Sequence, residues 1–141
     1  MPNPATYDDV NLILRLYEMR REDKMRLARQ WFAKDCKVRT MEDLMKVAPL
    51  GEEANAYFRM VTSYWEMVAS FITSGVLNED LFFQSGLELL FCWERIRDVV
   101  PGLREMFKNP NFLKNLEAVA AKFIQKMGPE TYQGFSARVR G

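Results

Sequence analysis

Two pairs of carboxylates stand at the four-residue spacing that places side chains together on one face of a helix. Glu18 precedes Glu22, and Glu94 precedes Asp98, by this interval. Mg²⁺ prefers such oxygen ligands, and helical hydrolases of nucleotide pyrophosphates carry several of them on two helices. Ordinary surface charge is the simpler interpretation, because arginines beside both pairs would neutralise them rather than leave a metal site open: Arg21, Arg95 and Arg97.

Histidine is absent from all 141 residues. Imidazole is the usual proton shuttle near neutral pH and a usual ligand of transition metals. Without it the serines lack their common activating base, and the sequence contains neither a Gly-x-Ser-x-Gly elbow nor a glycine-rich phosphate loop. A Glu-x-x-His di-iron bundle and a histidine-ligated haem are excluded as well. We therefore assign no catalytic residue, no metal and no cofactor.

Three cations on the first predicted helix form a candidate contact surface. Arg20 and Lys24 project near the middle of the apolar stripe of this helix, and Arg21 is their neighbour. A cation in this position must reach solvent, find a carboxylate or face something outside the domain, because an unpaired buried charge is very costly. The three could bind a partner or an anion, or they could be solvated or paired with nearby acidic residues. Both interpretations stay open.

The arginines of this helix do not indicate nucleic-acid binding. Acidic residues are interleaved with them, and opposite charges four residues apart, such as Glu22 and Arg26, are ordinary helix stabilisers. The formal net charge of the chain is +1, so no overall basic field attracts a polyanion. No helix-turn-helix spacing or zinc module stands out either.

The thiols and the termini indicate a soluble, cytoplasmic protein. Two unclustered cysteines, Cys36 and Cys92, make neither a disulfide framework nor a metal knuckle, which favours a reducing compartment. Cys92 lies in an apolar run and is expected to be buried, whereas Cys36, between Asp35 and Lys37, is expected near the surface. The N-terminus lacks the order of a secretory signal, and charges interrupt every apolar stretch before it reaches the roughly 18 residues of a membrane span.

Helical periodicity dominates the first half of the chain. We expect one long helix over residues 6–33, then a short helix that begins at the Thr40/Asp43 capping box and ends at Pro49. The clearest helix begins at residues 52–53 and ends near Gly75, where a left-handed residue would stop it. Apolar positions of the first helix share one side: Val10, Ile13, Leu14, Tyr17, Leu27, Ala28, Trp31 and Phe32.

The second half continues in the same pattern. Asn78 predicts the N-cap of one or two helical turns, and residues 87–100 predict a central helix that Pro101 breaks or kinks. A last strong helix is expected over residues 111–127, followed by a tail that docks as a short helix. We therefore predict an all-α fold, an irregular bundle of four main helices plus two or three short ones. It forms a single domain over residues 1–141, with flexible ends at 1–5 and 138–141.

One distinctive sequence pattern lies in the middle half of the chain. It consists of residues 58–69, which contain Trp65-Glu66, followed by the helix end Gly75-Val76-Leu77 and the later pair Trp93-Glu94. This pattern resembles a family of small all-helical bacterial domains of unknown function. The resemblance implies a bacterial helical protein and carries over neither an activity nor site residues.

These observations favour a non-enzymatic protein-interaction or regulatory module. We expect self-association or a protein partner, with the first helix and the methionine-bearing edges around Met60 and Met67 as candidate contacts. The alternative is a small-molecule or nucleotide-binding protein, including the Mg²⁺-dependent hydrolase considered above. Neither nucleic acid nor a membrane is expected as a partner.

Overall fold

The computed structural model describes residues 4–141, which form nine helices and no strand and are 75% helical. The predicted all-α class is confirmed. Six helices have ten residues or more, where four main helices were expected. The elements are α1 (Tyr7–Arg20), α2 (Asp23–Asp35), α3 (Met41–Val47), α4 (Glu53–Thr73), α5 (Glu79–Phe83), α6 (Leu87–Ile96), α7 (Val100–Met106), α8 (Lys114–Met127) and α9 (Pro129–Arg140).

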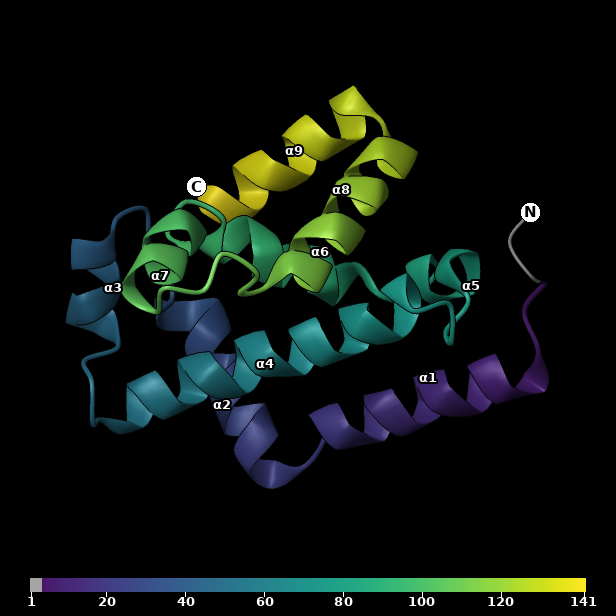
Figure 1. The fold of residues 1–141 in the computed structure, drawn as a ribbon, viewed down its shortest axis with the longest axis horizontal. Helices are drawn as coiled ribbons and strands as arrows, with labels where there is room; N and C mark the ends of the chain where they lie inside the picture. The colour runs from purple at the N-terminus through teal and green to yellow at the C-terminus, as the bar shows by residue number, and fades with distance from the viewer. Residues whose placement is uncertain (1–3) are drawn as a thin grey trace.

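Helix α4 is the centre of the fold (Figure 1). It is 21 residues long, and α2, α6 and α8 pack against it. Helices α8 and α9 run back along each other at the top of the view, and α9 also packs on α6. Buried apolar side chains from these helices form one continuous core, with Trp65 of α4 fully buried in it.

The expected first helix, residues 6–33, is in fact two helices, and Glu22 explains the break. Its backbone is extended (φ −60°, ψ 143°), and its carboxylate accepts hydrogen bonds from the amides of Lys24 and Met25. Glu22 is thus the N-cap of α2, a role more often taken by Asp, Asn, Ser or Thr. These amide donors also lower the pKa of Glu22. The turn sends α2 across α4 and leaves α1 along the lower edge of the molecule (Figure 1).

Two further boundaries differ from the predicted ones. The helix expected over residues 87–100 ends at Ile96, and Pro101 lies in the first turn of α7, where a missing amide donor does no harm. Helix α8 begins at Lys114 and not at residue 111, because Leu113 adopts the left-handed conformation with φ 59°. The predicted stop at Gly75 is confirmed, and this glycine has φ 83°.

The C-terminal tail forms a full helix, α9, rather than a short one. Phe135 and Val139 are buried, and Arg140 donates to the carbonyl oxygen of Glu94 and pairs with Asp98. We expected residues 1–5 and 138–141 to be flexible. Residues 1–3 lie outside the described residues, and residues 138–140 belong to α9.

Both cysteines are free and buried. This confirms the expectation for Cys92 and corrects the one for Cys36, which follows α2 and is fully buried. Its carbonyl accepts a hydrogen bond from Arg95, which draws the turn after α2 into the core. Burial raises the pKa of Cys36 to about 12 and raises the pKa of Cys92 well above its usual value.

Neither thiol is expected to react with an aromatic disulfide reagent at pH 8 while the chain is folded. The thiolate is the reactive form, and burial both suppresses ionisation and excludes the reagent. In concentrated guanidinium the unfolded chain should release two equivalents of the coloured thiolate within minutes, one for each cysteine. The native protein should release a negligible amount over the same time. Rapid modification of either native thiol would contradict this expectation.

Candidate functional site

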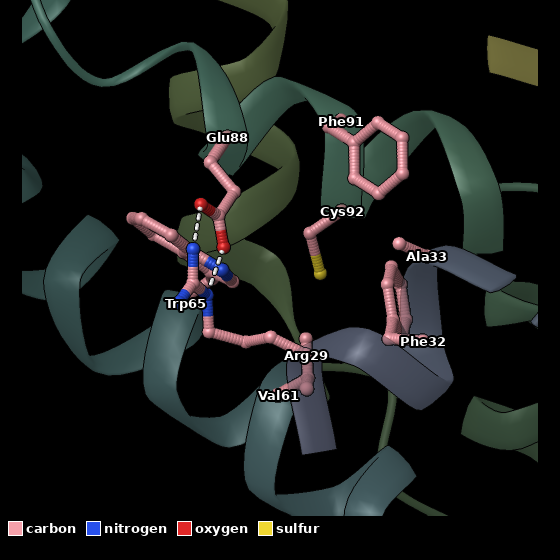
Figure 2. Close-up of a pocket in the computed structure, with 8 residues that line it drawn as sticks. All are labelled: Arg29, Phe32, Ala33, Val61, Trp65, Glu88, Phe91 and Cys92. Carbon is pink, nitrogen blue, oxygen red and sulfur yellow. Dashed lines mark hydrogen bonds and ion pairs between the residues drawn. The ribbon is translucent and has the colours of Figure 1, made fainter. Parts of the chain in front are cut away.

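A pocket opens where α2, α4 and α6 meet (Figure 2). Its volume is about 230 Å³. The walls are mostly apolar, and the polar features are one ion pair and one indole N–H. The lining residues are Arg29, Phe32 and Ala33 of α2, Val61 and Trp65 of α4, and Glu88, Phe91 and Cys92 of α6.

The ion pair of Arg29 and Glu88 lies at the mouth of the pocket, with side chains 30% and 33% exposed. Arg29 Nε and Nη2 donate to Glu88 Oε2 and Oε1, each at 2.7 Å, so the pair is bidentate (Figure 2). Arg29 Nη1 donates to the carbonyl oxygen of Arg20 at 3.1 Å, at the end of α1. The hydrogen bond to Glu88 raises the pKa of Arg29. The two charges therefore neutralise each other at the mouth.

Trp65 supplies an unusual polar group. Its side chain is fully buried, and its indole Nε1 has no hydrogen-bond partner among the described residues. Buried donors without an acceptor are rare in folded proteins. The guanidinium carbon of Arg20 lies 5.1 Å from the centre of the Trp65 ring, and Tyr64 packs edge-on with its centroid 4.9 Å away. These contacts fix the orientation of the indole.

The three predicted contact cations have different surroundings. Arg20 packs on Trp65 and donates to the hydroxyl of Tyr64 at 3.4 Å, so it is held against aromatic rings rather than extended into solvent. Arg21 is exposed and donates to the hydroxyl of Tyr17 at 3.0 Å. Lys24 is exposed, and its ammonium makes no ion pair with a described residue. Only Arg20 thus adjoins the pocket, through the indole of Trp65.

The four predicted metal carboxylates do not come together. Glu18 is exposed on α1, and the carboxylate of Glu22 is occupied by the amides that it caps. Glu94 is fully buried in α6, and Asp98, just beyond that helix, pairs with Arg140. No group of three metal-ligating side chains forms in the described part of the chain. The geometry gives the hydrolase alternative no support.

Glu94 anchors α9 to α6. The hydroxyl of Tyr132 donates to both carboxylate oxygens at 3.0 and 2.7 Å, and Ser136 Oγ donates to Oε1 at 2.9 Å. Arg97 Nε adds an ion pair at 2.8 Å. Burial and the hydrogen bond to Glu94 raise the pKa of Tyr132. The carboxylate is fully occupied by these donors.

Arg95 is also buried, at 8% exposure, and its partners are backbone carbonyls instead of carboxylates. Nε donates to Val139 at 2.8 Å, and Nη1 lies 3.0 to 3.2 Å from the carbonyl oxygens of Phe32, Ala33 and Cys36. The last three stand at the C-terminus of α2, the negative end of its dipole. Burial lowers the pKa of Arg95. From the sequence, Arg95 was expected only to neutralise neighbouring carboxylates, and nothing in the pattern around it indicated this role.

Helix α1 carries an apolar stripe that faces away from the core. We call these residues the α1 stripe: Tyr7, Val10, Leu14 and Tyr17, which are 77, 40, 53 and 47% exposed. Val10, Leu14 and Tyr17 were expected on the same side as the packed residues, and their exposure corrects that expectation. Because the helix breaks at Glu22, α1 is free to turn Leu12, Ile13 and Leu16 to the core instead.

Hydrogen bonds along α1 attach it to the rest of the fold without covering the stripe. Asp9 accepts the backbone amide of Asn78 at 2.8 Å, and the carbonyl of Leu16 accepts the hydroxyl of Tyr64 at 2.6 Å. The amides of Thr6 and Asn78 lower the pKa of Asp9. One face of α1 is thereby fixed, and the other is left open.

Fold and site define the class of the molecule: an all-α domain around a central helix, with a small apolar pocket. None of its helices over residues 4–141 is long and apolar enough to cross a membrane. Residues 5–123 match the DUF4760 family, described as a domain of unknown function, and the chain belongs to this family. This agrees with the resemblance to a helical domain family of unknown function. No curated protein and no solved structure matches the chain.

Proposed function

We propose that this protein is a non-enzymatic protein-interaction module that pairs with a second copy of itself through the α1 stripe. The observation that carries the proposal is the exposure of four large apolar side chains at intervals of three, four and three residues. This is the spacing of a coiled-coil seam. Contiguous exposed apolar surface on a folded domain marks an interaction site.

The stripe is complementary to itself in an antiparallel pair. A two-fold axis near the middle of α1 makes Val10 of one copy face Leu14 of the other, since equivalent patches meet in a two-fold interface. The same axis makes Tyr7 of one copy face Tyr17 of the other, because both pairs are symmetric about Leu12.

Other features support an interaction module over an enzyme. The chain contains no histidine, and the buried carboxylate of Glu94 is occupied by structural partners. Two free thiols with no disulfide suit a reducing compartment. These thiols and the resemblance to bacterial domains support a location in the bacterial cytoplasm.

The α1 stripe is tested by Leu14→Lys, with Val76→Lys as the matched control. Both side chains are exposed, at 53 and 67%, but Val76 lies outside α1. Sedimentation velocity should show a dimer of the unchanged chain, and Leu14→Lys should weaken it about thirtyfold, the effect of roughly 2 kcal/mol at an interface centre. Val76→Lys should leave dimerisation unchanged. A strictly monomeric unchanged chain, or equal dimerisation of Leu14→Lys, would refute the proposal.

A further inference from the structure

We infer that the pocket between α2, α4 and α6 binds a small, neutral, mainly apolar molecule whose single carbonyl oxygen accepts the indole N–H of Trp65. The inference is independent of pairing through α1. It rests on the size of the pocket, its apolar walls, its internally neutralised charges and its one free buried donor (Figure 2).

Size and lining define the body of the ligand. The pocket volume of about 230 Å³ exceeds the roughly 150 Å³ of an engineered apolar cavity that holds benzene. Phe32, Val61 and Phe91 supply apolar walls from three different helices. A substituted ring or a short branched chain fits this space, and mostly apolar walls with few polar groups are typical of small-molecule sites.

The free donor defines the polar group of the ligand. An indole N–H donates and cannot accept, so its partner must offer a lone pair, as a carbonyl oxygen does. Nε1 of Trp65 has no such partner among residues 4–141, although the side chain is fully buried. Arg20 and Tyr64 already hold the ring in place. The orientation of the donor is therefore set before binding. Nε1 is enclosed in the free protein, so the carbonyl oxygen reaches it only when side chains at the mouth, such as the partly exposed pair of Arg29 and Glu88, move aside.

The charges of the pocket define the ligand as neutral. Arg29 and Glu88 satisfy each other in a bidentate pair, and a third N–H of Arg29 is taken by the carbonyl of Arg20. No unpaired cation therefore lines the pocket to receive a phosphate or carboxylate. Burial raises the pKa of Cys92, so its thiol stays uncharged and adds to the apolar wall. Ketones, esters and tertiary amides fit these conditions, and nucleotides do not.

The experiment follows the indole N–H resonance of Trp65 by NMR during titration with two probes of similar shape, acetophenone and isopropylbenzene. Only acetophenone carries an acceptor. It should move the Trp65 indole proton downfield and saturate, whereas isopropylbenzene should bind at least about tenfold more weakly, as expected when a buried donor gains no partner. The resonances of Trp31 and Trp93, which lie outside the pocket lining, serve as internal references.

Variants separate the pocket from nonspecific binding. Ala33 lines the pocket and is exposed, so the larger side chain of Ala33→Leu should occupy part of the pocket and abolish the acetophenone shift. Ala118→Leu, exposed on α8, should leave the shift unchanged. Trp65→Phe identifies the resonance and should remove the preference for acetophenone. If this variant does not fold, the Ala33→Leu comparison still decides.

Three results would overturn the inference. The first is that no probe moves the Trp65 resonance. The second is that acetophenone and isopropylbenzene bind equally well, which would make the donor irrelevant. The third is that the indole proton contacts water in the free protein and stays unchanged with acetophenone, since an ordered water would then be its only partner.

Discussion

Replacing Arg95 by methionine is expected to lower the free energy of unfolding by about 3 to 5 kcal/mol, a large share of the stability of a small domain. Methionine keeps an apolar stem beside Phe91, whose ring centre lies 4.6 Å from the guanidinium carbon, but it donates no hydrogen bond. The carbonyl of Val139 and those at the end of α2 lose their donor. Buried acceptors left unpaired carry the full cost of their desolvation.

Urea unfolding followed by circular dichroism measures this loss. Arg95→Lys keeps the charge, but a single ammonium cannot donate to the carbonyls of two helix ends as the guanidinium does. An intermediate loss of unfolding free energy is therefore expected. Arg138→Met, exposed on α9, is the matched control and should stay within about 0.5 kcal/mol of the unchanged chain. Equal stability of the Arg95→Met and Arg138→Met chains would show that the carbonyls find other donors.

Replacing Glu94 by leucine is expected to cost about 2 to 4 kcal/mol, the second largest effect. The hydroxyls of Tyr132 and Ser136 and the guanidinium of Arg97 all lose their acceptor, although Arg97, at 36% side-chain exposure, can turn to water. The same measurement on Glu42→Leu, whose pair with Lys46 is exposed, should show less than about 0.5 kcal/mol.

A double-mutant cycle tests whether Glu94 acts through Tyr132. Tyr132→Phe should cost about 1 kcal/mol in the unchanged chain and much less when Glu94 is already leucine, because the hydroxyl then has no carboxylate to bind. Additive losses of the two substitutions would contradict the direct contact between these side chains.

Local signals in the sequence were sufficient for the fold class and for several helix ends. The Thr40/Asp43 capping box is present as predicted at the start of α3, and the side chain of Thr40 accepts the amide of Asp43. Gly75 takes the left-handed conformation that only glycine adopts readily. In these places one or two neighbouring residues decide the conformation, so no knowledge of the tertiary structure is needed.

The missed features depend on contacts between distant residues. Glu22 has a good intrinsic helix propensity. Nothing in the neighbouring sequence distinguishes a glutamate inside a helix from one that forms an N-cap, as Glu22 does. Helix α9 contains Gly134 and Ser136, weak helix formers, and it is held by Glu94 and Arg95 some forty residues earlier in the chain. Local propensity therefore predicts less helix in the tail than the structure shows.

The pocket could not be predicted from the sequence, for the same reason. Arg29 and Glu88 are 59 residues apart, and no spacing rule connects them. Trp65 belongs to a regular apolar stripe of α4, so its pattern indicates core packing and says nothing of an unpaired N–H. The sequence singled out Arg20 as a cation within an apolar stripe. That its partner is an aromatic ring became evident only from the fold.

Helix α9 has a consequence for how this protein should be divided. The match to its family ends at residue 123, inside α8, whereas Tyr132, Ser136 and Val139 complete the surroundings of two buried polar side chains on α6, Glu94 and Arg95. A recombinant fragment cut at that boundary would leave a carboxylate and a guanidinium facing an empty groove. We therefore expect the cooperative folding unit of this chain to extend beyond the segment that matches the family.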